Sequence, residues 1–117
     1  MGDRRIAEIR TRDGSIYFYT HWGGYHLPNE AFNAIMAAKP RWDDESYATR
    51  IIVDQLLAPY RDQALGAGLL LRPQAEDAYN YDKPSVIINL ASRTLVVIDG
   101  DNSTTTQFGE QPEKLEE

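Results

Sequence analysis

Cysteine is absent from this chain of 117 residues, which excludes disulfides, thiolate metal sites and thiol nucleophiles. No apolar run approaches the ~18 residues that a membrane-spanning helix needs. The opening residues, Met1–Arg5, are not followed by the apolar stretch of a signal peptide. We therefore expect a cytoplasmic protein that has no membrane segment.

Positive charge is scarce, with 12 Lys and Arg against 18 Asp and Glu, a net charge of −6 and a pI of about 4.8. Such an acidic chain is poorly suited to the phosphate backbone, so extended nucleic-acid binding is not expected. A pocket with a few arginines stays compatible with that charge. Part of the acidity lies in residues 110–117, which we predict to be a disordered tail.

The other 109 residues, 1–109, have the length of a single folded domain. Within it, Asp13-Gly14 is a two-residue hairpin signal. Folding about it places Ile9 opposite Phe18 and Arg12 opposite Ser15. Alternation then assigns one face to the core, and the other face carries Glu8, Arg10, Arg12, Tyr17, Tyr19 and His21.

Two helices are predicted next. The first begins at Leu27-Pro28 and ends before Pro40, with an apolar stripe at helical spacing. The second begins after a cap at Asp43 or Asp44 and is interrupted at Pro59. Its apolar stripe is wide, which favours burial on more than one side and a homodimer.

The remaining elements are strands. Residues 69–71 form a short apolar run, residues 73–84 read as a polar loop, and residues 86–90 and 94–98 form a hairpin. An edge strand over 103–108 is a further option. The order is ββ-αα-β-ββ-(β), which predicts an α+β fold with an antiparallel sheet, built from the N-terminal hairpin and the C-terminal strands, packed with two helices.

The candidate site lies where the first hairpin meets the first helix. Residues 17–26 contain five of the twelve aromatic residues and both histidines, together with a pair of glycines. We expect the side chains of this run to stack on or hydrogen-bond a ligand, and two arginines to hold its negative charge. The predicted ligand-binding residues are Tyr19, His21, Trp22, Tyr25, Arg41 and Arg50. The alternative is an ordinary solvated sheet face, on which Tyr and Arg are common.

Other chemistry finds little support in the sequence. His21 and His26 are five residues apart, which is not the spacing of a helical metal pair. No nucleophile signature or phosphate-binding loop is present. We therefore expect no metal, no cofactor and no catalysis. Trp22 and Trp42 each have a structural alternative, in which the ring fills a gap between sheet and helix and its N–H reaches a carbonyl.

Three segments follow one another in the chain: Tyr17-x-Tyr19-x-His21-Trp22-x-Gly24-Tyr25, then Leu27-Pro28, then Arg41-Trp42-Asp43-Asp44-x-Ser46-Tyr47-x-x-Arg50-Ile51-Ile52. Together with Val97-Ile98-Asp99, they resemble a group of small uncharacterised proteins found in phage genomes and prophage-derived bacterial regions. The resemblance covers most of the chain and implies a phage origin, but no activity. Many such sequences have Asp where this chain has Gly23, so no carboxylate role is expected there.

These observations predict a phage-type, non-catalytic binding protein that captures a small planar anionic ligand. In its most specific form, the hypothesis is that this ligand is a nucleotide-like signal of host defence. The alternative is an inhibitor or adaptor whose acidic surface docks on a basic host protein, with aromatic side chains as anchors. A structural or accessory phage protein that has no ligand is a third reading.

Overall fold

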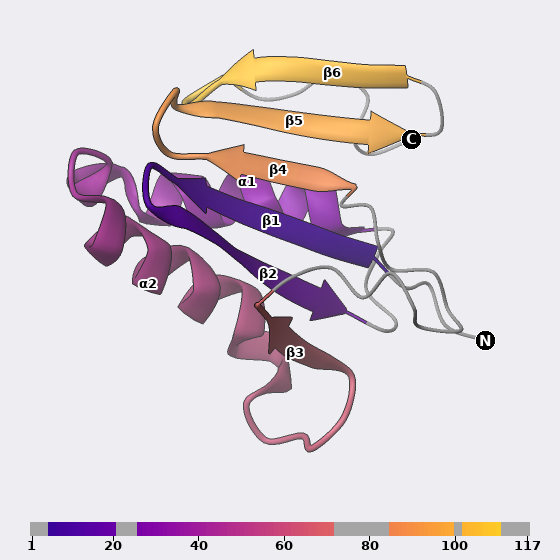
Figure 1. The fold of residues 1–117 in the computed structure, drawn as a ribbon. Coiled ribbons are helices and arrows are strands. Elements are labelled where there is room, and N and C mark those ends of the chain that lie inside the picture. The colour runs from indigo at the N-terminus through magenta and orange to yellow at the C-terminus, as the bar shows by residue number, and fades with distance from the viewer. Residues whose placement is uncertain (1–4, 21–25, 72–84, 100–101, 111–117) are drawn as a thin grey trace.

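The structure is a computed structural model and describes residues 5–20, 26–71, 85–99 and 102–110. The expected loop over 73–84 and all but the first residue of the predicted tail lie outside the described residues. The elements are β1 (Arg5–Thr11), β2 (Gly14–Thr20), α1 (Leu27–Ala37), α2 (Glu45–Leu57), β3 (Ala67–Leu70), β4 (Val86–Asn89), β5 (Thr94–Asp99) and β6 (Asn102–Gln107) (Figure 1). Short 3-10 turns follow each helix, at Lys39–Arg41 and Ala58–Tyr60.

The six strands form one sheet in the order β3-β2-β1-β4-β5-β6. The α+β class is confirmed, but the expected antiparallel sheet is confirmed only in part, because β1 and β4 pair in parallel. The long connection through both helices brings the chain back to the end of the sheet at which β1 begins. The sheet also has more strands than the two predicted hairpins, since β3 and β6 extend its edges.

The first hairpin turns one residue earlier than predicted. Thr11 lies opposite Gly14, so the loop consists of Arg12 and Asp13. The Thr11 hydroxyl donates to the Gly14 carbonyl at 2.9 Å and accepts the Asp13 N–H at 3.1 Å. Gly14 has a φ of 137°, which suits glycine. The register shifts by two residues, so the predicted partners are wrong, but the described strand residues keep their predicted faces. Arg12, which was predicted on a sheet face, lies in the loop instead.

Both helices begin and end close to where the sequence predicts. Pro28 lies in the first turn of α1, and Asp44 caps α2 by accepting the backbone N–H of Tyr47 at 3.3 Å. α2 buries one stripe: Ala48, Ile52 and Leu56. Much of the remaining apolar side of α2 packs partly against the core of the same chain: Ile51, Val53 and Leu57.

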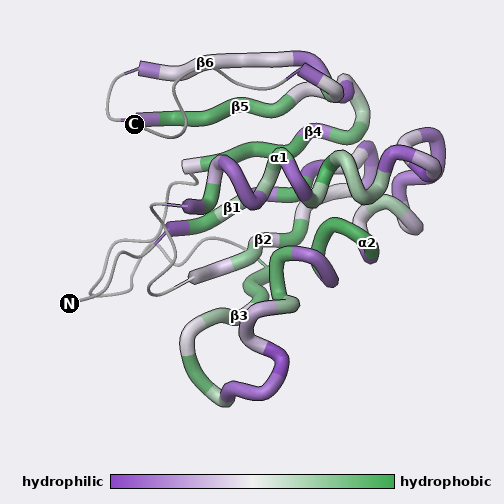
Figure 2. The backbone as a smooth tube through the Cα atoms, turned by 180° about the vertical axis from the view of Figure 1, so that it is seen from behind, coloured by the Kyte–Doolittle hydropathy of each residue, from purple (hydrophilic) through white to green (hydrophobic). Residues whose placement is uncertain are grey.

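The two helices cover the same face of the sheet. They lie behind the strands in Figure 1 and in front of them in Figure 2. The covered face contributes much of the core: Ala7, Ile9, Phe18, Val86, Ile88 and Leu95. Alternation along the paired strands places another set on what we call the second face: Ile6, Glu8, Tyr17, Tyr19, Ile87 and Val96. Among the described residues, neither helix has the length and apolarity needed to cross a bilayer.

Candidate functional site

The predicted site residues that the structure describes lie in two different layers. Tyr19 is on the second face of the sheet, opposite Ile6. Arg41 and Arg50 belong to the helical layer, which covers the other face. The structure therefore does not bring Tyr19 together with the two arginines. The other three predicted residues, His21, Trp22 and Tyr25, lie outside the described residues.

The two predicted arginines have different surroundings. The Arg41 guanidinium carbon lies over the Tyr47 ring, 5.4 Å from its centroid. Arg50 is exposed on α2. Asp54, one turn further along α2, bonds to Arg61 at 2.5 Å.

Trp42 has the structural role that the sequence allowed for. Its indole N–H donates to the Ile35 carbonyl at 2.9 Å. Its ring packs on Phe108, with the two centroids 5.0 Å apart. Trp42 therefore ties the end of β6 to α1, while one side of the ring still lines a surface groove.

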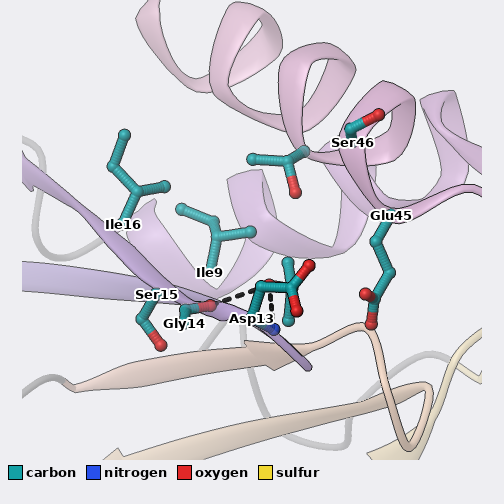
Figure 3. A pocket seen from close by; sticks show the side chains of 9 residues that line it. Ile9, Asp13, Gly14, Ser15, Ile16, Glu45 and Ser46 are labelled. Carbon is teal, nitrogen blue, oxygen red and sulfur yellow. Dashed lines mark hydrogen bonds between the residues drawn. The ribbon is translucent and has the colours of Figure 1, made fainter.

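A hollow opens between the tip of the first hairpin and the start of α2 (Figure 3). We call it the hydroxyl hollow; it has a volume of about 410 Å³. Ile9 and Ile16 give it an apolar surface, and the hairpin tip adds Asp13 and Gly14. The rest of its lining is polar: Thr11, Ser15, Glu45, Ser46 and Thr49. The hollow is therefore an open surface depression that combines some apolar surface with polar groups.

One polar atom of the hydroxyl hollow has an unmet hydrogen bond. The Thr49 Oγ1 is buried and has no hydrogen-bond partner among the described residues. A buried hydroxyl without a partner costs about 1–3 kcal/mol.

A second groove lies next to the hollow, and we call it the arginine groove. It has a volume of about 320 Å³ and is lined by Arg12, Trp42, Asp43, Glu45, Leu90, Ala91 and Arg93. Three turns that are far apart in sequence meet there: the first hairpin loop, the turn before α2 and the turn between β4 and β5.

Glu45 lines both cavities and joins them. Its two carboxylate oxygens accept the backbone N–H of Arg12 at 3.4 and 3.2 Å. The Arg12 side-chain Nε lies 3.6 Å from Oε1 of the same carboxylate. The charge of Arg12 is therefore largely balanced, and the pair fixes the hairpin loop against α2.

Arg93 is the second cation of the groove and is held in an unusual conformation. Its φ is 58°, in the left-handed region, where a non-glycine residue costs about 1–2 kcal/mol. The turn that imposes it is well bonded, because the Ser92 N–H donates to Asn89 Oδ1 at 3.0 Å. The Arg93 carbonyl also accepts the Phe108 N–H at 2.9 Å. Strain of this kind is concentrated at functional sites.

A third polar cluster lies on the second face, and its members bond to one another. Glu8 is only 6% exposed and accepts hydrogen bonds from Arg10 Nε at 2.9 Å and Ser15 Oγ at 2.6 Å. Burial acts to raise the pKa of Glu8, but the bonds from Arg10 and Ser15 outweigh it and lower that pKa. Because its partners already satisfy the carboxylate, this cluster is a structural element.

Sequence reasoning assigned no ligand contact to the residues that line the two cavities. Arg12 was assigned to a sheet face, and neither Arg93 nor Glu45 was singled out. The only local signal was a charged residue in each of three turns, which does not say that the turns meet.

Comparison with protein-family models, with curated proteins and with solved structures gives no match to this chain. The resemblance to phage proteins therefore stays a prediction. The described residues also contain no group of three or more potential metal ligands.

Proposed function

We propose that this protein is a non-catalytic binding protein for a small planar anionic ligand, with a nucleotide as the best-fitting class. The observation that carries the proposal is the meeting of Arg12 and Arg93 beside Trp42, in a groove that shares Glu45 with the hydroxyl hollow. The ligand would span both cavities, with its anionic end in the groove and its planar part in the hollow.

Charge selects the anionic end. Arg12 is balanced by Glu45, whereas Arg93 forms no ion pair with a described residue. A guanidinium binds a phosphate or carboxylate through two parallel hydrogen bonds, which are among the strongest in proteins. Arg93 is therefore the principal anion contact. Asp43, on the groove wall, disfavours an anion that does not reach Arg93.

The hydroxyl hollow suits a planar, heteroatom-bearing group. Ile16, which is only partly buried, offers apolar contact to the face of a ring. The Ser46 hydroxyl donates to Asp44 Oδ1 at 3.2 Å and can still accept a hydrogen bond from the edge of a nucleobase. Glu45, the carboxylate that lines both cavities, is already bonded to Arg12.

Binding of nucleoside monophosphates, measured by calorimetry, tests the proposal. Arg93→Asn removes the charge and keeps a residue that tolerates the left-handed region. We expect at least a tenfold loss of affinity in Arg93→Asn, because the ligand loses its charge-assisted hydrogen bonds to that side chain. Arg50→Asn is the matched control, since it removes an exposed arginine outside both cavities. Equal losses in Arg50→Asn and Arg93→Asn would show that the groove is not the site.

A second candidate function is the binding of a basic protein. The net charge of −6 favours it, as does the second face, where Tyr17, Tyr19, Ile87 and Val96 are each only partly buried. Tyrosine is enriched at protein interfaces. Under this alternative, no nucleotide would raise the melting temperature, and Tyr19→Ala would weaken a salt-sensitive interaction with the partner. Arg93→Asn would leave that interaction unchanged.

A further inference from the structure

Within the part of the chain that the structure describes, the sixth strand is an edge without the charges, prolines or bulges that usually prevent pairing with another strand. β6, Asn102–Gln107, is last in the strand order and pairs with β5. Figure 1 shows it along the upper border of the sheet. Its six residues, Asn-Ser-Thr-Thr-Thr-Gln, include no charge and no proline. Its register with β5 runs one to one over the whole strand, without a bulge. Natural proteins usually block such an edge with one of these devices.

The hydrogen bonds at the end of β6 reveal which backbone groups point away from β5. The Gln107 N–H donates to Glu110 Oε1 at 3.0 Å, and the Gln107 carbonyl accepts the Glu110 N–H at 3.0 Å. Phe108, the next residue, instead donates its N–H to Arg93 across the hairpin. Inward and outward residues alternate in an antiparallel pair. The N–H and carbonyl of Thr105 and of Ser103 therefore also point outward, and Glu110 covers only the groups of Gln107.

We propose that a second copy of this chain pairs with β6, antiparallel, about a two-fold axis that passes beside Thr104. Ser103 would then lie opposite Thr105 of the partner subunit, and Thr105 opposite the partner's Ser103. All four outward backbone groups of each copy would be used, in four hydrogen bonds between the copies. The result is one continuous sheet, with the helices of both copies on the same side.

Symmetry selects both the occupant and the register. A symmetric antiparallel pair must place one residue opposite its own copy, because paired side chains share a face. The open groups of Ser103 and Thr105 are centred on Thr104, so the strand is complementary to itself. An axis beside Thr105 would instead require the groups of Gln107, which Glu110 already uses.

Charge and edge length support the same choice. Two chains of net charge −6 repel each other, and an uncharged strand is the place where they can approach with the least repulsion. The other edge of the sheet, β3, has only four residues. This interface lies beyond the proposed ligand site and does not depend on it. It also differs from the interface through α2 that the sequence suggested.

Cysteine cross-linking tests the register directly, because the natural chain has no cysteine. Across the axis, two copies of Thr104 would have Cα atoms about 4.5 Å apart, within the range of a disulfide. Two copies of Thr105 would be roughly 8 Å apart, beyond that range. We expect Thr104→Cys to form a covalent dimer under mild oxidation and Thr105→Cys to stay largely monomeric. No dimer for Thr104→Cys, or equal yields for both variants, would overturn the proposal.

Sedimentation equilibrium supplies an independent measurement. The natural chain should show a mass rising from 13.3 kDa towards twice that value as its concentration increases. Thr105→Pro removes an outward N–H without touching the bonds to β5, and edge strands tolerate proline. It should stay monomeric, whereas the control Thr105→Val, which keeps the backbone donor, should dimerise. A natural chain that is monomeric at roughly 1 mM, or a dimer that survives in a folded Thr105→Pro, would overturn the interface.

Discussion

A few residues carry most of what is unusual in this molecule, and Glu8 is the most buried charge among them. Its carboxylate is held by Arg10 and Ser15 on the second face. Replacing it with glutamine leaves Arg10 without its counter-charge. Because the Arg10 side chain is 45% exposed, water compensates for part of the loss, and we expect a cost of about 1–2 kcal/mol.

The pH dependence of that cost follows from the lowered pKa of Glu8. The ordinary value is 4.5 and the folded value lies below it, so the unfolded chain takes up the proton first as the pH falls. The carboxylate therefore contributes stability above pH 4.5, and that contribution is lost as the pH falls through the folded pKa. Urea unfolding should give Glu8→Gln a lower free energy of unfolding than the natural chain at pH 7, and this difference should disappear in acid. A difference in the free energy of unfolding that does not change with pH would contradict a lowered pKa of Glu8.

Arg93 predicts a conflict between stability and binding. Glycine adopts the left-handed region without strain, so Arg93→Gly should raise the free energy of unfolding by about 1 kcal/mol. The same variant should lose the ligand, because the groove loses its principal cation. Thermal melting and calorimetry on one sample check both effects. A destabilised Arg93→Gly would mean that the side chain supports the turn through other contacts.

At the scale of elements, local chemistry was enough to place the helices. The cap at Asp44, the proline at position 28 and the apolar stripes gave their starts and ends. The hairpin register was beyond local chemistry, because the loop at Arg12 is fixed partly by Glu45, which is 33 residues away. A two-residue signal such as Asp13-Gly14 gives the presence of a turn more securely than its position.

The cap itself is testable. Asp44→Ala removes the acceptor for the Tyr47 N–H and should cost about 1 kcal/mol. Asp43→Ala is the matched control: it removes the neighbouring acidic residue, which is exposed and does not cap the helix. Equal stability of the two variants, measured by urea unfolding, would show that the cap contributes nothing.

At the scale of the whole molecule, the sequence was least informative. The class and the element order followed from periodicity, but the parallel pairing joins Ala7 to Val86, and no local pattern records a contact of that range. The candidate cavities could not be predicted from the sequence for the same reason, because three separate turns form the arginine groove. For Tyr19, the strand and the face were predicted from the local pattern. Its separation from Arg41 and Arg50 could not be predicted, because it depends on how the sheet and the helices pack.

Trp42 ties these distant parts together. Trp42→Phe loses the hydrogen bond to Ile35 and should cost about 1 kcal/mol, whereas Trp42→Ala also empties the contact with Phe108 and should cost about 3 kcal/mol. Thermal melting ranks the two variants. A Trp42→Ala protein as stable as Trp42→Phe would mean that the ring contact adds little.

The parallel pairing of β1 with β4 also has a consequence for synthesis. β1 lies in the middle of the finished sheet, but one of its neighbours is made about 80 residues later. At a ribosomal rate of 5–20 residues per second, β1 would wait roughly 4–16 s for that partner. During this interval the side of β1 that β4 later occupies is an unpaired strand edge. A nascent chain that stalls before residue 86 is therefore the form of this protein most exposed to aggregation and most in need of a chaperone.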